Sequence, residues 1–321
     1  LGGIFRFLHS FDQPYNLFPS LHIALRTLLA DVYGRHTRGL LRWASLGWFS
    51  LIGFSTVFTW QHHVLDVAGG FALAALVFYL IPGTAGRLPV LPNRRIGAYY
   101  TLGFLAALAG AIGFWPFWPG ASLLFWPALS LGIVAAAYFG LGPSIYRKTE
   151  GRLPLSARVV LAPVLLGQAL SLLYYRMRCR PWDPVTPNVW IGRRLSHRKA
   201  AGAVKAGVTA VLDLTVEFSE TEPFLATHYL HLPVLDLTAP TPAQMEEAAI
   251  FIERHAKTGT VYVHCKIGYS RSAAVLGAYL LRSRAARTPE EAVEKLRAAR
   301  PSLVVRPEAF QALREFHAGL A

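Results

Sequence analysis

The sequence predicts an α-helical transmembrane bundle followed by an α/β domain, in which a mostly parallel central sheet is flanked by helices. Two observations predict this fold class. Hydrophobic residues make up 53% of the 321 residues and charged residues only 16%, whereas a soluble chain usually carries about 25% charge. The charges are also unevenly placed: residues 1–180 hold 15 basic and 4 acidic side chains, and residues 181–321 hold 17 and 14. The first part therefore has the composition of a membrane domain and the second that of a soluble one.

The apolar part is divided into helices by its helix breakers. Residues 96–146 contain no charged side chain and no histidine, which is too long for one span of about 20 residues. The segment Trp115–Gly120 divides this run, because it combines helix breakers with tryptophans, which favour the membrane interface. A shorter helix is expected over 21–34, and transmembrane helices over 43–61, 67–86, 97–115 and 121–141.

The arginines indicate which ends of these helices lie inside the cell. They gather in alternate loops, after the first, third and fifth expected helices, and the positive-inside rule places such loops in the cytoplasm. The apolar stretch 159–175 then either crosses the membrane or lies flat on it. Its short length and Pro163 favour the flat arrangement. Cys265 also favours it, because that arrangement places the cysteine in the cytoplasm, where thiols stay reduced. That arrangement leaves the second domain cytoplasmic, at a bacterial inner membrane.

Composition thus divides the chain into three regions. Residues 1–86 form a membrane domain, residues 87–180 add further helices and a linker, and residues 181–321 form the α/β domain. The chain opens on Leu1 without an initiating methionine, and no signal peptide is visible. We therefore expect the chain to begin inside a longer protein and the first region to be truncated.

Three ionisable residues of the first region are expected at the outer membrane face. His22 begins the first helix, and His62 and Asp66 are four residues apart, a spacing that predicts one helix face. Asp66 would then orient the His62 ring and leave its other nitrogen basic, which suits a nucleophile. Interfacial histidines with a capping aspartate, or a metal site of these three residues, are alternatives. His63 is interpreted as an ordinary interfacial residue.

These residues carry a family resemblance over residues 12–82. The segment Phe18–His22, followed by Ser55 and by His62-x-x-x-Asp66, resembles the type 2 phosphatidic acid phosphatase superfamily, above all its inositol phosphorylceramide synthase-like branch. The resemblance implies that His62 attacks phosphorus, that Asp66 orients it and that His22 protonates the leaving group.

The first region departs from this pattern in two places. Thr56 stands where phosphatases of the superfamily usually have arginine, and the upstream Lys and Arg-Pro motif is absent from the sequence. Arg26, one turn after His22, is a candidate phosphate contact. An arginine that reaches to the membrane surface or pairs with Asp31 is the alternative.

The second domain contains a cysteine motif at an expected strand–helix junction. A β-branched run ends at Cys265, and five residues separate it from Arg271 and an apolar helix. Such a loop can wrap its N–H groups around phosphate, while an arginine fork holds two oxygens. The positive surroundings would lower the pKa of the thiol, and the thiolate is the nucleophile. Ser272 can stabilise the leaving thiolate, and the expected phosphate-binding residues are Lys266, Ile267, Gly268, Tyr269, Ser270 and Arg271. A buried inert cysteine would not explain this spacing.

A general acid is needed for an alcohol leaving group. Asp236 lies on an expected loop after a short strand, whereas Asp213 lies at a strand end and is better explained as a structural residue. No metal or other cofactor is required for this chemistry.

The cysteine motif is similar to that of protein tyrosine phosphatase-like enzymes, and the length of 181–321 fits the small dual-specificity kind. That resemblance implies Asp236 as the acid. Flanking segments, including Val189–Gly192 and Val305–Pro307, look like those of the mitochondrial phosphatidylglycerophosphate phosphatase and its bacterial and plant relatives. This narrower resemblance implies a phospholipid or phosphoinositide headgroup as substrate.

The expected partners are a lipid membrane and a phosphorylated lipid or phosphoprotein. A membrane-tethered protein phosphatase with a non-catalytic membrane domain, and a phosphate-binding module with a decayed site, remain as alternatives. Nucleic acid is not expected, because the second domain has no basic–aromatic stripe despite the net charge of +14.

Overall fold

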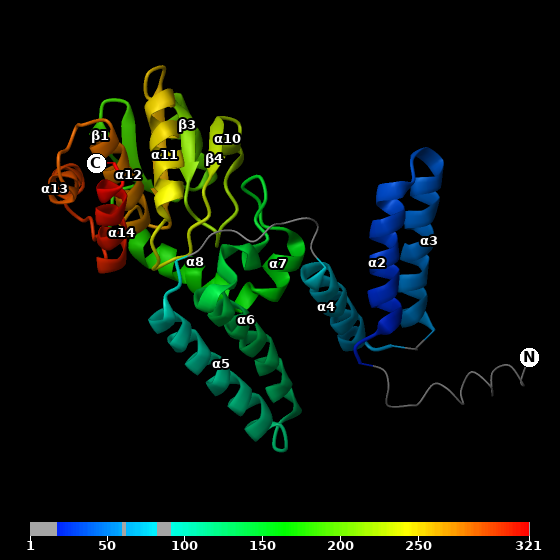
Figure 1. Cartoon of the computed structure of the whole chain (residues 1–321). Helices are drawn as coiled ribbons and strands as arrows, with labels where there is room; N and C mark the ends of the chain where they lie inside the picture. The colour runs from blue at the N-terminus through cyan, green and yellow to red at the C-terminus, as the bar shows by residue number, and fades with distance from the viewer. Residues whose placement is uncertain (1–17, 60–61, 82–90, 321) are drawn as a thin grey trace, which may run out of the picture. The chain divides into compact units, whose positions relative to one another are not determined.

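A computed structural model describes residues 18–59, 62–81 and 91–320, and these fall into two compact units. The first unit contains helices α2, α3, α4 and α7, and the second contains the remaining helices and all described strands (Figure 1). An α-helical region and a mixed α/β domain are therefore both present, as the sequence predicts.

The first unit is built on three helices, α2 (Leu21–His36), α3 (Gly39–Phe58) and α4 (Val64–Leu80), with the short α7 (Leu155–Val160) packed on α4. Ser20 caps α2 and donates its main-chain N–H to the carbonyl of Asp66, 3.0 Å away. Gly70 permits this contact, because a Cβ there would lie 2.5 Å from the Ser20 carbonyl oxygen. The start of α2 is thereby held against the first turn of α4.

The second unit begins with an apolar helical hairpin. Helix α5 (Arg94–Phe114) packs on α6 (Phe125–Ala136), which follows a 3₁₀ turn at Pro119–Leu124 and continues into irregular helical turns up to Tyr146. In the described residues, Arg94–Phe114 and the run Pro119–Tyr146 are long and apolar enough to cross a membrane. At 1.5 Å per residue, the 21 residues of α5 extend about 30 Å, the thickness of a hydrocarbon core.

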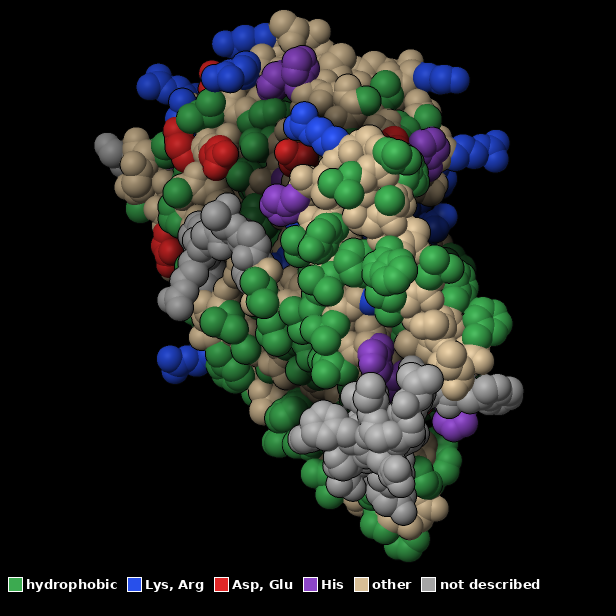
Figure 2. Space-filling view, turned by 90° about the vertical axis from the view of Figure 1, so that its right-hand side faces the viewer, with side chains coloured by type: hydrophobic (Ala, Val, Ile, Leu, Met, Phe, Trp, Pro, Cys, Tyr) green, Lys and Arg blue, Asp and Glu red, His purple; other side chains and the backbone are tan. Residues whose placement is uncertain are grey.

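Helix α8 (Ala162–Arg176) has two faces of different character. Its buried positions, Val164, Gln168 and Leu172, recur every four residues. The opposite face exposes a continuous apolar stripe made of Leu166, Leu170, Leu173, Tyr174 and Met177. Figure 2 draws one face of the molecule, on which many hydrophobic side chains are exposed.

The α/β domain has a five-stranded sheet in the order β1-β2-β5-β3-β4. The four strands β2 (Val189–Arg193), β3 (Val208–Asp213), β4 (His228–His231) and β5 (Thr260–Cys265) are parallel. The sequence predicts strands near residues 188–191, 208–214, 229–232 and 260–264, and these correspond to the four parallel strands. The fifth, β1 (Trp182–Thr186), pairs antiparallel to β2 and was not predicted. Its Asp183 and Pro184 conceal the strand pattern.

Helices cover both faces of this sheet (Figure 1). Strand β5 lies at the centre and is buried along its whole length. One face carries α11 (Pro242–His255), α12 (Ser270–Arg282), α13 (Pro289–Ala299) and α14 (Pro307–Ala318), and the other carries α9 (His197–Lys205) and α10 (Glu222–Leu225). Cys265 is the last residue of β5, so the central strand delivers it to the carboxyl edge of the sheet.

Candidate active site

The loop between β5 and α12 is short and lies against strand β2. It joins Cys265 to Ser270, the first residue of α12, in four residues. Gly268 has a φ of +72° and lies against the main chain of Gly192, where a Cβ would come within 2.4 Å of the carbonyl oxygen. Only glycine fits this position without strain. The Ser270 hydroxyl donates to the carbonyl of Val304, which anchors the end of the loop.

The Cys265 thiol is buried and electrostatically activated. Burial by itself would raise the pKa of the thiol, but the Arg271 guanidinium, the Ser272 hydroxyl and the N–H groups of Tyr269 and Ser272 outweigh burial. The pKa of Cys265 therefore lies below its ordinary value. The Ser272 hydroxyl makes no other hydrogen bond among the described residues, so it is available to the thiolate.

Arg271 is held by a carboxylate that the sequence analysis did not identify. Its Nη2 lies 2.7 Å from Oε1 of Glu217 and its Nη1 lies 3.2 Å from Oε2. Nη1 also donates to the carbonyl of Val234 at 2.8 Å. All of these atoms are buried, so the guanidinium is fixed before a phosphate arrives.

Asp236 lies beside the phosphate-binding loop, on the segment between β4 and α11. Its Oδ1 is 3.1 Å from Nη2 of Arg271, and its Oδ2 contacts Nζ of Lys266. Burial would raise the pKa of the carboxyl, but Arg271 and Lys266 together hold the pKa below its ordinary value. The structure thus brings Cys265, Arg271 and Asp236 to one site.

The same site receives side chains from the apolar helices of its own unit. Lys266 Nζ donates to Oε1 of Gln168, in the middle of α8, at 2.8 Å. The Tyr138 hydroxyl, after α6, donates to the main-chain carbonyl of Asp236 at 2.7 Å. Tyr175 of α8 makes an edge contact with the Tyr269 ring, with centroids 6.3 Å apart. Sequence reasoning missed these residues, since no local motif joins an apolar helix to a catalytic loop.

Asp213, Glu220 and His264 form a buried cluster behind the loop, with ligand-type atoms within 4.8 Å of one another. The Lys148 ammonium lies 2.6 Å from Oδ2 of Asp213, and His264 Nε2 lies 3.1 Å from Oε2 of Glu220. Burial would lower the pKa of His264, but Asp213 and Glu220 raise the pKa above its ordinary value. The lysine and the imidazole supply the positive charge of this cluster, so its geometry is that of an ion-pair network and does not fit a metal.

The first unit also brings its three predicted site residues together. His22 Nδ1 lies 3.2 Å from His62 Nε2, and His62 Nδ1 lies 3.8 Å from Oδ2 of Asp66. The nitrogen of His62 that faces away from Asp66 therefore faces His22. Their catalytic roles stay predictions.

One expectation for this unit was wrong in detail, and one alternative is excluded. His62 and Asp66 do not share a helix face, because α4 begins at Val64 and Asp66 instead forms a capping box with His63. The carboxylate of Asp66 is consequently bound to the His63 main-chain N–H, at 2.8 Å. Arg26 does not pair with Asp31, whose carboxylate bonds Arg35.

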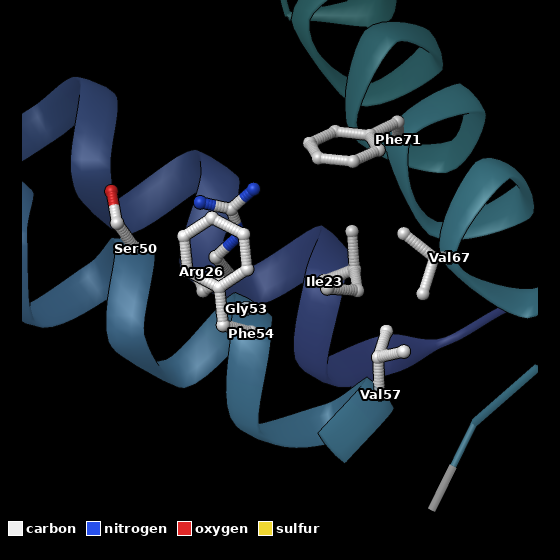
Figure 3. A pocket seen from close by; sticks show the side chains of 8 residues that line it. All are labelled: Ile23, Arg26, Ser50, Gly53, Phe54, Val57, Val67 and Phe71. Carbon is white, nitrogen blue, oxygen red and sulfur yellow. The ribbon is translucent and has the colours of Figure 1, made fainter. Parts of the chain in front are cut away.

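Arg26 instead lines a cavity of about 280 Å³ between α2, α3 and α4 (Figure 3). Its guanidinium lies over the Phe71 ring, 5.1 Å from the centroid, and makes one long bond of 3.4 Å to the Phe49 carbonyl. The other lining side chains are Ile23, Ser50, Phe54, Val57 and Val67, with Gly53. Among the described residues this guanidinium has no carboxylate partner, and its role as a phosphate contact stays a prediction.

Comparison with known proteins yields two family matches. The model of the dual specificity phosphatase catalytic domain matches residues 189–318. The model of the PAP2 superfamily matches residues 4–80, which contain His22, His62 and Asp66.

Individual relatives match part of the chain. Phosphatidylglycerophosphatase and protein-tyrosine phosphatase 1 of Rattus norvegicus is 38% identical over 94 residues, 29% of this chain and 48% of the rat protein. Phosphatidylglycerophosphate phosphatase PTPMT2 of Arabidopsis thaliana is 29% identical over 168 residues, 50% of this chain and 72% of the plant protein. Dual specificity phosphatase 28 of Mus musculus is 35% identical over 132 residues, 38% of this chain and 74% of the mouse protein.

The chain spans about half the length of the rat relative and about three quarters of the mouse one. The motifs on which the sequence prediction rested lie inside the matched segments. The chain therefore belongs to the dual-specificity phosphatase family, with a PAP2-superfamily region ahead of its catalytic domain.

Proposed function

We propose that the protein is a membrane-associated phosphatase that hydrolyses phosphomonoesters of phospholipid headgroups through a phosphocysteine intermediate. The observation that carries this proposal is the convergence of Cys265, Arg271 and Asp236 at the carboxyl edge of the central strand, with the pKa of the thiol below its ordinary value. Membership of the dual-specificity family supports the reaction class.

In the first step, the Cys265 thiolate attacks phosphorus and the bond to the leaving alkoxide oxygen breaks. Arg271 and the loop N–H groups hold the phosphoryl oxygens. An incoming phosphate dianion takes the place of the Asp236 carboxylate at Arg271, and its negative charge raises the pKa of that carboxyl. Asp236 is then protonated in the complex and gives its proton to the leaving oxygen.

In the second step, water attacks the phosphocysteine and the phosphorus–sulfur bond breaks. The Asp236 carboxylate takes a proton from the water, and inorganic phosphate leaves. Ser272 donates its hydroxyl to the departing Cys265 thiolate. No metal or other cofactor takes part in these two steps.

A lipid substrate is favoured by the surroundings of the site. Gln168 and Tyr175, seven residues apart on α8, both contact the phosphate-binding loop, so α8 runs along the domain instead of leading away from it. The stripe of apolar side chains from Leu166 to Met177 on its opposite face is exposed, and Arg176, Arg178 and Arg180 lie at its end. Apolar side chains beside arginines suit an anionic membrane surface.

The same arrangement supports a cytoplasmic position of the catalytic domain. Both ends of the α5–α6 hairpin contact the segment between β4 and α11 that carries Asp236, through Asn93 and Tyr138. Arg94 and Arg95 lie at the first of these ends, and Arg147 follows the second. The positive-inside rule assigns such ends to the cytoplasm. A membrane-impermeant thiol reagent should therefore label Cys265 in opened cells and leave it unlabelled in intact cells. Labelling in intact cells would place the domain outside.

The proposed function is tested by substrate profiling of the purified full chain. We expect hydrolysis of phosphatidylglycerophosphate and of phosphoinositides in mixed micelles to exceed hydrolysis of phosphotyrosine and phosphoserine peptides, and Cys265→Ser to abolish both. The matched control is Cys179→Ser, which changes the second cysteine of the chain. Faster hydrolysis of the peptides would favour a membrane-tethered protein phosphatase. Unchanged activity of Cys265→Ser would overturn the proposal.

The PAP2-superfamily region, proposed to span residues 1–86, is a candidate for a second phosphotransfer site. The observation that favours it is the approach of His22 to His62, with Asp66 on the far side of the His62 ring. In this proposal His62 attacks a lipid phosphate, Asp66 orients it and His22 protonates the leaving group. Activity that survives Cys265→Ser and disappears in Cys265→Ser/His62→Gln would support a histidine-based reaction, and no such activity on any phospholipid would contradict it.

A further inference from the structure

The segment that carries the general acid has a strained conformation. Leu237, directly after Asp236, has a φ of +58°, a left-handed conformation that side chains other than glycine adopt at a cost. This segment is not part of a helix or strand. A strained, irregular segment keeps its geometry only when neighbouring groups hold it.

Two side chains of the helical hairpin hold the main chain of this segment. The Tyr138 hydroxyl donates to the carbonyl of Asp236 at 2.7 Å, and Nδ2 of Asn93 donates to the carbonyl of Leu237 at 2.9 Å. The two donors are themselves joined, because the Asn93 N–H donates to the Tyr138 carbonyl at 3.2 Å. Tyr100 stacks on the Tyr138 ring, with centroids 5.4 Å apart and planes 13° from parallel.

A third contact reaches the carboxylate. Lys266 Nζ is shared between the carboxylate of Asp236 and Oε1 of Gln168. The Gln168 side chain is buried, and its Nε2 donates to the Tyr100 hydroxyl at 3.3 Å. Tyr100 thus joins the support of the carboxylate to the support of the main chain.

We propose that Asn93, Tyr138 and Gln168 are positioning residues for the general acid Asp236, so that the apolar helices complete the active site of the phosphatase domain. This inference rests on the proposed function. The three side chains touch no reacting atom: they fix the carboxyl group where it can protonate the leaving oxygen. Loss of one of them weakens proton donation and leaves attack by Cys265 in place.

The test uses the full chain in detergent micelles and a series of aryl phosphates with increasingly basic leaving groups. A well-placed acid makes the rate nearly independent of leaving-group basicity, and a misplaced acid makes the rate fall as basicity rises. The variants are Tyr138→Phe, which keeps the stacked ring, Asn93→Ser, which keeps a cap for α5, and Gln168→Leu. We expect each to steepen this dependence and to lower kcat about tenfold for the most basic leaving group, part of the roughly 100- to 10,000-fold that a general acid contributes.

Two controls frame the result. Tyr99→Phe removes a hydroxyl of helix α5 that accepts a hydrogen bond from Arg95. This variant should match the wild type. Asp236→Asn should give the steepest dependence. A merely structural role would lower the rate equally for all leaving groups, which would overturn the inference. If one variant fails to fold, as judged by circular dichroism, the other two still decide.

The outcomes separate this inference from the proposed function. If Asp236→Asn steepens the dependence while all three variants match the wild type, the positioning role fails and the proposed mechanism stands. If Asp236→Asn itself leaves the dependence unchanged, the assignment of the acid fails.

Discussion

The Lys148 ammonium lies 2.6 Å from a carboxylate oxygen of Asp213, and both side chains are shielded from solvent. The same ammonium donates to the Thr215 carbonyl at 2.8 Å. The pair joins the linker before α7 to the end of β3, next to the central strand that carries Cys265. Both charges are buried, and Lys148 is the nearest compensating charge for Asp213, whose other carboxylate oxygen lies 3.8 Å from His264 Nε2.

Removal of the ammonium is therefore expected to be costly. Lys148→Met should lower the free energy of unfolding by about 3–5 kcal/mol, the usual cost of leaving a buried charge unpaired. Burial would raise the pKa of Asp213, but Lys148 helps to hold that pKa below its ordinary value. The pair therefore stabilises the folded state fully at pH values above the ordinary pKa of an aspartate, and its contribution to stability decreases as the pH falls. The difference in the free energy of unfolding between wild type and variant should consequently become smaller at acid pH.

Denaturant unfolding of the chain in micelles, followed by near-ultraviolet circular dichroism, measures this effect. The control is Lys295→Met, whose ammonium lies 2.8 Å from Glu291 on the surface, and which should cost about 1 kcal/mol or less. An equal loss of unfolding free energy in the two variants would contradict the predicted contribution of the buried pair to stability.

Glu217 is expected to determine how well Arg271 binds phosphate. Glu217→Gln keeps the shape of the side chain but removes the charge that holds both guanidinium nitrogens. We expect inhibition by inorganic phosphate to weaken about tenfold, since a hydrogen bond to a charged group contributes about 1.5–3 kcal/mol. The measurement is the inhibition constant of phosphate, with Glu222→Gln as the control because that carboxylate is exposed and pairs with Arg152. An unchanged constant in Glu217→Gln would refute the role.

The pH dependence of thiol reactivity should report on Ser272. Its hydroxyl lowers the pKa of Cys265, so Ser272→Ala should raise that pKa and move the midpoint of alkylation by iodoacetamide to higher pH. The shift should be roughly one unit, which corresponds to one hydrogen bond of about 1.4 kcal/mol. The experiment uses a Cys179→Ser background and Ser283→Ala as the control, whose hydroxyl donates to the Leu280 carbonyl. A midpoint that stays in place would show that the thiolate does not use this hydroxyl.

The apolar stripe on α8 is expected to contact lipid. A polarity-sensitive fluorophore on Leu170→Cys, in a background without Cys179 and Cys265, should shift to the blue in proteoliposomes and be quenched by lipid-attached quenchers. The same fluorophore on Lys257→Cys, at an exposed position after α11, should do neither. Equal spectra at both positions would exclude contact between this stripe and the bilayer.

The sequence was informative wherever chemistry is local. The cysteine loop is continuous in the chain, so its residues, its strand and its helix could all be predicted from Cys265 to Ser272. His22, His62 and Asp66 were also identified, although the helix of Asp66 begins after His62. The spacing of four brings His62 near Asp66, but only Asp66 lies in the helix, and the turn before the helix carries His62.

Contacts between distant segments could not be predicted in this way. Glu217, Tyr138 and Gln168 are 54, 98 and 98 residues from their partners Arg271, Asp236 and Lys266. Each is an unremarkable residue in its own neighbourhood. Gln168 is a polar residue within the apolar stretch 159–175, and such a residue in a buried position requires a partner.

Among the described hydrogen bonds, those between the α5–α6 hairpin and the segment that carries Asp236 come only from the two ends of the hairpin. They are made by Asn93, before α5, and by Tyr138, after α6. The stretch between Thr101 and Ile133 makes no described hydrogen bond to that segment, so we expect changes in its length and composition to leave Asp236 in place as long as α6 still packs on α8. In the proposed membrane-spanning arrangement of the hairpin, bilayers of different thickness could be matched by adding or removing helical turns there, while Asn93 and Tyr138 keep their contacts. A chain built in this way can adapt to a new membrane and keep the same catalytic geometry.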